Sequence, residues 1–266
     1  MSELLDIQAK ASVWTVRLNR PQVRNALSLE MMRCLTQTAE QLRDETGVRA
    51  VILCGAGPHF CAGMDLGELQ KSDANTLSLA ERRALAAVGE RMCQAWEDIP
   101  AMTVCAIEGH CIGGGAALAA ALDFRVVGAS AWFWLPEIAL GIPLGWGALP
   151  RLVRLLGPAR AKRFIILCER VKGPQAIDFG LADYQAADGQ ADAEALKLAL
   201  RIAELPEVAV KMSKQAVNAT ANALNHLASH MVSDQLALAL ASEEAQAARS
   251  SFAAKAKSSD DKQERR

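Results

Sequence analysis

The rest of the chain is built around the stretch Ile107–Leu122, IEGHCIGGGAALAAAL, which joins an expected strand to an expected helix. It follows a short apolar run, 102–107, whose residue types favour a buried strand, and it ends in alanine and leucine, which favour a helix. The three consecutive glycines between them, 113–115, allow close approach of another backbone or of a ligand. A helix that begins there has free N–H groups and a positive dipole end. Such an end can stabilise an oxyanion.

Two other interpretations of the glycine run have to be compared with this one. A triple glycine between a strand and a helix is often only a tight turn under close packing. A nucleotide-phosphate loop does not fit, because no Lys-Ser/Thr pair follows and the spacing is not that of a dinucleotide fingerprint. Taken alone, the run therefore leaves the tight turn and the oxyanion site open.

The composition is that of one globular unit. The chain has 266 residues, 51% of them hydrophobic and 22% charged, which is enough to bury a large core. The formal net charge of -1 gives no electrostatic reason to expect nucleic acid or an anionic membrane surface. No apolar run approaches the roughly 18 residues of a membrane span, and the first residues, MSELLDIQAK, lack a signal-peptide core. We expect a cytoplasmic protein that binds neither nucleic acid nor membrane.

Cysteine and histidine give no metal-binding pattern. The seven cysteines form no C-x-x-C pair and stand mostly among apolar residues, which is typical of reduced core cysteines. Of the four histidines, only His226 and His230 share a helix face, without an acidic residue in ligand spacing. We expect no metal site.

Strands and helices alternate in the first part of the chain, as in an α/β unit. Strands are expected at 12–19, 48–54, 102–107 and 124–127, and helices at 29–43, 79–98, 147–156, 159–168 and 175–179. From about residue 192 the pattern is helical only, with helices expected at 193–203, 207–223 and 225–248. The predicted division is a core at 1–191 and a helical region at 192–266 that offers faces to partner subunits and ends in a frayed, charged tail.

Glu137 is a lone carboxylate in the segment 132–150, WFWLPEIALGIPLGWGALP. One interpretation is a helix N-terminal carboxylate that complements the helix dipole. The other is a carboxyl group enclosed by apolar side chains, whose raised pKa suits it to proton transfer.

Five motifs in fixed order resemble those of the crotonase superfamily, the enoyl-CoA hydratase/isomerase family, and the resemblance covers nearly the whole chain. They are LNRPQVRNALS (18–28), HFCAGMDL (59–66), EGHCIGGG (108–115), LPEIALGIP (135–143) and GLADY (180–184). The resemblance implies an α/β fold in which repeated β-β-α units form a spiral, followed by an α-helical oligomerisation region. It also implies a homotrimer or a homohexamer made of two trimers.

The resemblance further implies an acyl-CoA thioester as substrate and no cofactor beyond the coenzyme A that the substrate carries. The backbone amides of Met64 and Gly114 match the pair that holds the thioester oxygen, and Glu137 matches the acid/base. The adenine end is expected near Arg24 and Ala26 and along the loop Ala62–Leu66. The residues expected to contact the substrate are Arg24, Ala26, Ala62, Gly63, Asp65, Leu66, Gly113 and Pro136.

One position departs from the family pattern. Hydratases of the family commonly carry a second glutamate, and the matching position here is Ala117, which can neither donate nor accept a proton. Isomerases of the family use only the glutamate equivalent to Glu137, so the best-supported reaction is the conversion of 3-enoyl-CoA to 2-enoyl-CoA. Hydration with one carboxylate is the alternative, and the related hydratase-lyases rely on tyrosines, whereas this chain has only Tyr184.

Three further alternatives stay open. Glu68 or Glu81 could supply another carboxylate, although a solvated position is the simpler interpretation. Lys255 matches a coenzyme A contact at the C-terminus, but the glycine that normally precedes it is missing. The chain could also be a non-catalytic acyl-CoA-binding protein that has lost its second carboxylate.

Overall fold

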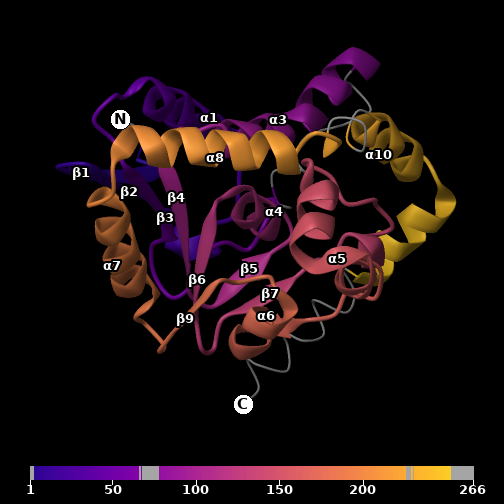
Figure 1. Cartoon of the computed structure of the whole chain (residues 1–266). Coiled ribbons are helices and arrows are strands. Elements are labelled where there is room, and N and C mark those ends of the chain that lie inside the picture. The colour runs from indigo at the N-terminus through magenta and orange to yellow at the C-terminus, as the bar shows by residue number, and fades with distance from the viewer. Residues whose placement is uncertain (1–2, 66, 68–77, 226–228, 230, 253–266) are drawn as a thin grey trace.

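Two β-sheets form the centre of the molecule (Figure 1). The computed structural model describes residues 3–65, 67, 78–225, 229 and 231–252. The larger sheet has the strand order β1-β2-β3-β4-β6-β9, and only the β1–β2 pair is antiparallel. Its strands are β1 (Leu5–Lys10), β2 (Val13–Leu18), β3 (Ala50–Gly55), β4 (Met102–Ile107), β6 (Phe124–Gly128) and β9 (Tyr184–Ala186). The smaller sheet joins β5 (His110–Ile112), β7 (Trp132–Trp134) and β8 (Val171–Lys172).

The central strands of the larger sheet are buried on both faces. In β3, alternate residues belong to different packing clusters: Ile52 packs with α7 (Ala191–Ala203), whereas Val51 and Leu53 pack in the main core. This alternation follows from the two-residue period of a strand. A strand covered by helices on both faces consists almost entirely of apolar residues. The run AVILC could therefore be predicted as a strand from the sequence.

The main core lies on the face opposite α7 and contains α1 (Leu29–Asp44), α3 (Leu79–Glu97) and α4 (Gly114–Ala121). Other helices of the described chain include α5 (Ala148–Ile166), α6 (Gly173–Phe179), α8 (Glu207–Ala221), α10 (Val232–Leu240) and the 3-10 helices η1 (Pro21–Val23) and η2 (Ile138–Leu140). All eight residues of α4 are buried, because glycine and alanine let α3 and α5 pack closely against it. Its N-terminus therefore lies inside the protein.

Side-chain caps fix the starts of two helices. Ser28 Oγ accepts a hydrogen bond from the N–H of Met31, which confirms the predicted cap of α1. At α3, Ser78 and Glu81 form a capping box, with Glu81 Oε2 accepting from the N–H of Ser78 at 2.8 Å. Glu81 is thus an exposed helix cap rather than a carboxylate of the cavity described below.

The break expected between the helices 147–156 and 159–168 is confirmed, because α5 spans both but is kinked at Gly157, whose φ of 72° and ψ of 161° are not helical. One predicted helix boundary is wrong. The helix expected over 225–248 is interrupted, because α10 ends at Leu240 and the next helical stretch begins at residue 243. The division of the chain at residue 191 stays a prediction; α7, which contains that point, packs on the larger sheet.

Candidate active site

A cavity of about 320 Å³ lies where the N-terminus of α4 meets η2, α3 and α10. Its wall includes residues of the loop 62–64, the glycine run, the segment 134–146 and side chains from α3 and α10. The loop after β3 reaches the glycine run because Cys61 pairs in parallel with Cys111 of β5, and the N–H of Ile112 donates to Cys61 O at 3.0 Å.

The backbone amides of Met64 and Gly114 lie close together on this wall. The loop is held by a bridge between Leu27 and Met64, in which the N–H of Leu27 donates to Gly63 O at 2.7 Å. A methyl group added at Gly63 would lie 3.4 Å from the nitrogen of Gly114. Among the described residues, nothing accepts a hydrogen bond from the N–H of Met64 or of Gly114. Both donors are therefore available to a ligand oxygen.

The glycine run has the conformation that this arrangement needs. Gly113 has φ 51° and ψ -119°, a combination that a residue with a side chain rarely adopts. Its own N–H donates to Trp134 O at 2.8 Å, so the first free amide is that of Gly114. The tight turn is thus present, and it leaves the N–H of Gly114 without an acceptor among the described residues; the oxyanion site stays a prediction.

Glu137 lies beside the same helix N-terminus. A methyl group at Gly113 would come within 3.0 Å of Glu137 Oε1, so the carboxyl group is in contact with the glycine run. Glu137 Oε2 is buried and has no hydrogen-bond partner among the residues that the structure describes. Burial raises the pKa of Glu137 to about 7, because removal from water disfavours the charged form. Glu137 is the N-cap residue of η2, and its side chain makes no capping hydrogen bond there. The interpretation as a carboxylate that complements a helix dipole stays a prediction.

Trp146 fills the space on the other side of the α4 N-terminus. A methyl group added at Gly114 would come within 2.1 Å of the outer edge of the indole, and one added at Gly89 within 2.1 Å of the fused edge. Ala117 lies one helical turn after Gly114 and also faces the cavity. The indole is therefore wedged between α3 and α4, over the helix face that carries Ala117.

His110 is a cavity residue that the sequence did not single out. Its ring stacks on His59 with 3.9 Å between ring centroids. Burial, with the nearby His59, Arg24 and Arg170, lowers the pKa of His110 to about 4, so the imidazole is neutral at pH 7. A histidine next to a glycine turn carries no sequence signal that distinguishes a cavity wall from a packed loop.

The structure brings most of the predicted site residues together. The following line the one cavity: Arg24, Ala62, Gly63, Met64, Gly113, Gly114, Pro136 and Glu137. Ala26 and Asp65 do not line it; Ala26 O accepts from Arg20 Nη1, and Asp65 forms an ion pair with Arg20 at 3.0 Å. Leu66, Glu68 and Lys255 lie outside the described residues. The roles predicted for all these residues stay predictions.

The described residues contain neither a helix that could span a membrane nor a group of metal ligands. None of the helices between residues 3 and 252 that the structure describes has the length and apolar character to cross a bilayer. Within the same residues, no three side chains among His, Cys, Asp and Glu gather as metal ligands would.

The fold and the site together define a class of protein: a crotonase-type α/β protein whose cavity combines two free backbone amides with a buried carboxyl group. Comparison with known proteins agrees with this. The family model described as enoyl-CoA hydratase/isomerase matches residues 8–262. The chain belongs to the enoyl-CoA hydratase/isomerase family and is an enzyme that acts on CoA thioesters.

Among its relatives, the short-chain-enoyl-CoA hydratase of Clostridium acetobutylicum is 32% identical over 213 residues, which cover 80% of each chain. The 2,3-dehydroadipyl-CoA hydratase of Escherichia coli is 31% identical over 220 residues, covering 82% of each chain. The crystal structure of an enoyl-CoA hydratase from Bacillus anthracis matches 80% of this chain and 82% of that one, with 32% identity and a TM-score of 0.75. The predicted fold class, with its helical C-terminal region, is confirmed.

Proposed function

We propose that this enzyme converts a 3-enoyl-CoA thioester to the conjugated 2-enoyl-CoA, with Glu137 as the only acid/base. The observation that carries the proposal is the environment of Glu137: its carboxyl group touches the glycine run, leaves one oxygen without a partner and has a pKa of about 7. A base whose pKa lies near the working pH is efficient at both taking and returning a proton.

The reaction needs one proton to move and one charge to be stabilised. Ionised Glu137 takes the proton from the alpha carbon, and the electron pair of that C–H bond passes into the thioester to form a dienolate. The N–H groups of Met64 and Gly114 donate to the enolate oxygen, where the negative charge develops. Glu137, now protonated, returns the proton to the gamma carbon. The double bond thereby moves into conjugation, and no water is consumed.

The surroundings of Ala117 support isomerisation over two-carboxylate hydration. Ala117 has no proton to exchange, and the indole of Trp146 lies over the same helix face. A second carboxylate and its water would have to occupy space that this ring fills. Position 117 has no carboxylate that could accept a proton from water, and the indole of Trp146 is apolar. Both features disfavour the positioning of a water molecule at the beta carbon.

The test is turnover of 3-enoyl-CoA and 2-enoyl-CoA by the wild type and by Glu137→Gln. We expect isomerisation by the wild type and a loss of about 10²-fold or more in the variant, because general acid–base catalysis commonly contributes that much. Exposed Glu40→Gln, on α1, removes the same charge away from the cavity and serves as the control. Equal isomerisation rates for Glu137→Gln and the wild type would rule out this mechanism.

Hydration of 2-enoyl-CoA with one carboxylate is the second candidate. It is favoured by the relatives, several of which carry hydratase names. The same assay separates the two reactions, since a hydratase makes a 3-hydroxyacyl product. A protein that only binds acyl-CoA would bind both thioesters and exchange no proton at the alpha carbon with deuterated solvent.

The assembly and the cellular location also remain proposals. A trimer or a pair of trimers is supported by apolar side chains that α7 and α8 leave exposed, among them Leu200, Val208 and Met212. Light scattering on the purified full chain tests this. The cytoplasmic location rests on the sequence alone and is tested by cell fractionation.

A further inference from the structure

Glu90 is a charged side chain at the end of the cavity formed by α3 and α10. It follows Ala86 by four residues on α3, so the two share a helix face, and both line the cavity. Val232 and Leu236 of α10 line the same cavity. Glu90 is half-buried, and among the described residues it has neither an ion-pair nor a hydrogen-bond partner. A carboxylate in this position is costly unless something donates to it.

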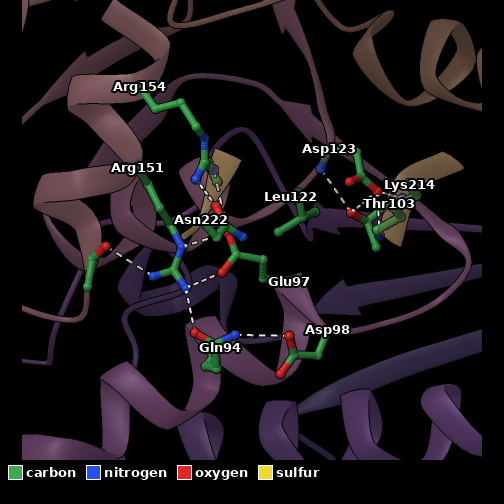
Figure 2. Close-up of polar contacts among 12 residues, drawn as sticks. Gln94, Glu97, Asp98, Thr103, Leu122, Asp123, Arg151, Arg154, Lys214 and Asn222 are labelled. Atoms are coloured by element: carbon green, nitrogen blue, oxygen red, sulfur yellow. Dashed lines mark hydrogen bonds and ion pairs between the residues drawn. The ribbon is translucent and has the colours of Figure 1, made fainter. Parts of the chain in front are cut away.

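A separate polar chamber of about 240 Å³ meets the acyl cavity at Glu90, which lines both. The chamber is built around a buried ion pair between Arg151 and Glu97, 2.7 Å apart (Figure 2). Asn222 and Ser229 also line it. Glu90 therefore stands at the boundary between an apolar cavity and a polar one.

Arg151 interacts electrostatically with Glu90, but all of its N–H donors are already used in other hydrogen bonds. Its Nε and Nη2 donate to the two oxygens of Glu97 at 3.2 and 2.7 Å, and Nη2 also donates to Gln94 Oε1 at 3.2 Å. Its Nη1 donates to Trp146 O and Gly147 O at 3.2 and 3.1 Å. A guanidinium group has five N–H donors, so none is left for Glu90.

Glu90 and Gly114 line the same cavity of about 320 Å³, with the indole of Trp146 between α3 and the N-terminus of α4. A cavity of this volume holds only a short chain beyond the thioester. A group that reaches Glu90 from a thioester held at Gly114 therefore belongs to a short acyl chain.

We propose that Glu90 is a specificity-determining residue that selects short acyl chains ending in a hydrogen-bond donor, either a hydroxyl or an ammonium group. This inference rests on the proposed function only in that the ligand is an acyl-CoA thioester. The same carboxylate repels an acyl chain that ends in a carboxylate, because two like charges would meet in a half-buried site. A plain alkyl chain would bury the carboxylate without giving it a donor.

The test is the affinity of four saturated thioesters, measured by calorimetry, since saturated chains bind without being isomerised or hydrated. The four are pentanoyl-CoA, 5-hydroxypentanoyl-CoA, 5-aminopentanoyl-CoA and glutaryl-CoA. We compare the wild type with Glu90→Leu, which removes the acceptor, and Glu90→Gln, which keeps an acceptor but removes the charge. Exposed Glu40→Gln is the control for lost charge.

For the wild type we expect the hydroxy and amino thioesters to bind at least about tenfold more tightly than pentanoyl-CoA, and glutaryl-CoA to bind most weakly. In Glu90→Leu this preference should disappear. In Glu90→Gln the preference for the ammonium group should be lost and glutaryl-CoA should gain affinity.

Two results overturn the inference while leaving the proposed function standing: a wild type that does not distinguish the four thioesters, or a Glu90→Leu variant that loses affinity for all of them equally. If the wild type binds none of the four, the acyl-CoA function itself fails, and the role of Glu90 fails with it.

Discussion

The raised pKa of Glu137 makes the stability of this enzyme depend on pH in a defined direction. The ordinary pKa of the carboxyl group is 4.5, and burial raises it to about 7 in the folded protein. Between these values the folded protein keeps a proton that the unfolded chain releases. The free energy of unfolding therefore falls as the pH rises through this interval, and the loss is complete above a pH of about 7.

Replacing Glu137 by glutamine removes this effect, because the amide does not titrate. One pKa unit corresponds to about 1.4 kcal/mol, so at high pH the charged carboxylate destabilises the fold by about 3 kcal/mol. Relative to the wild type, Glu137→Gln should gain about 2.5 kcal/mol in unfolding free energy between about pH 5 and about pH 9. Urea denaturation of both proteins at the two pH values measures this difference.

The variant and the wild type are compared at the same pH. The contributions of the other titrating groups to the unfolding free energy are therefore nearly the same in both proteins and cancel in the difference. Glu40→Gln, in an exposed position, should show no such gain. A stability difference between Glu137→Gln and the wild type that is the same at both pH values would mean that the carboxyl group titrates normally. The proposed acid/base chemistry would then lose its physical basis.

Three other predictions address the site and its support. The kcat/KM for 3-enoyl-CoA should rise with pH and level off above a pH of about 7, because only the ionised carboxylate can take the alpha proton; a rate that is flat across this range would contradict this. Gly114→Ala should lower both the melting temperature and kcat, since the new methyl group would come within 2.1 Å of the Trp146 ring, whereas Gly47→Ala, with nothing within 4 Å, should change neither. Arg151→Met should lower the free energy of unfolding by about 3 kcal/mol or more, because it leaves Glu97 buried without its main partner; a loss below about 1 kcal/mol in urea denaturation would show that the pair is dispensable.

The parts of the fold that could be predicted from the sequence are long or strongly patterned. The helix expected at 79–98 is α3, Leu79–Glu97, because its apolar residues repeat at helical spacing and Ser78 caps it. The strand expected at 102–107 is β4 at the same residues. Strands β5 and β7, with three residues each, were not predicted, because pairing with distant segments defines them.

The residues of the site likewise divide into those with a local sequence signal and those whose position depends on tertiary packing. Met64, Gly114 and Glu137 could be placed in one site before the structure, because each stands in a motif with a local backbone signal or a recognisable resemblance. Glu90 could not, since α3 has several glutamates and nothing local tells which helix face meets a cavity. That information depends on how α3 packs against α4 and α10.

The position of Trp146 explains why the loss of one carboxylate and the presence of several small residues belong together. The indole fits only because Gly89 and Gly114 have no side chain. Ala117 lies one helical turn after Gly114 and lines the same cavity as the ring, so a glutamate at position 117 would share that cavity with it. A second carboxylate with its water would therefore share one cavity with the indole ring. In this chain the ring is present and the carboxylate is not, which supports the proposed reaction with Glu137 as the single proton shuttle.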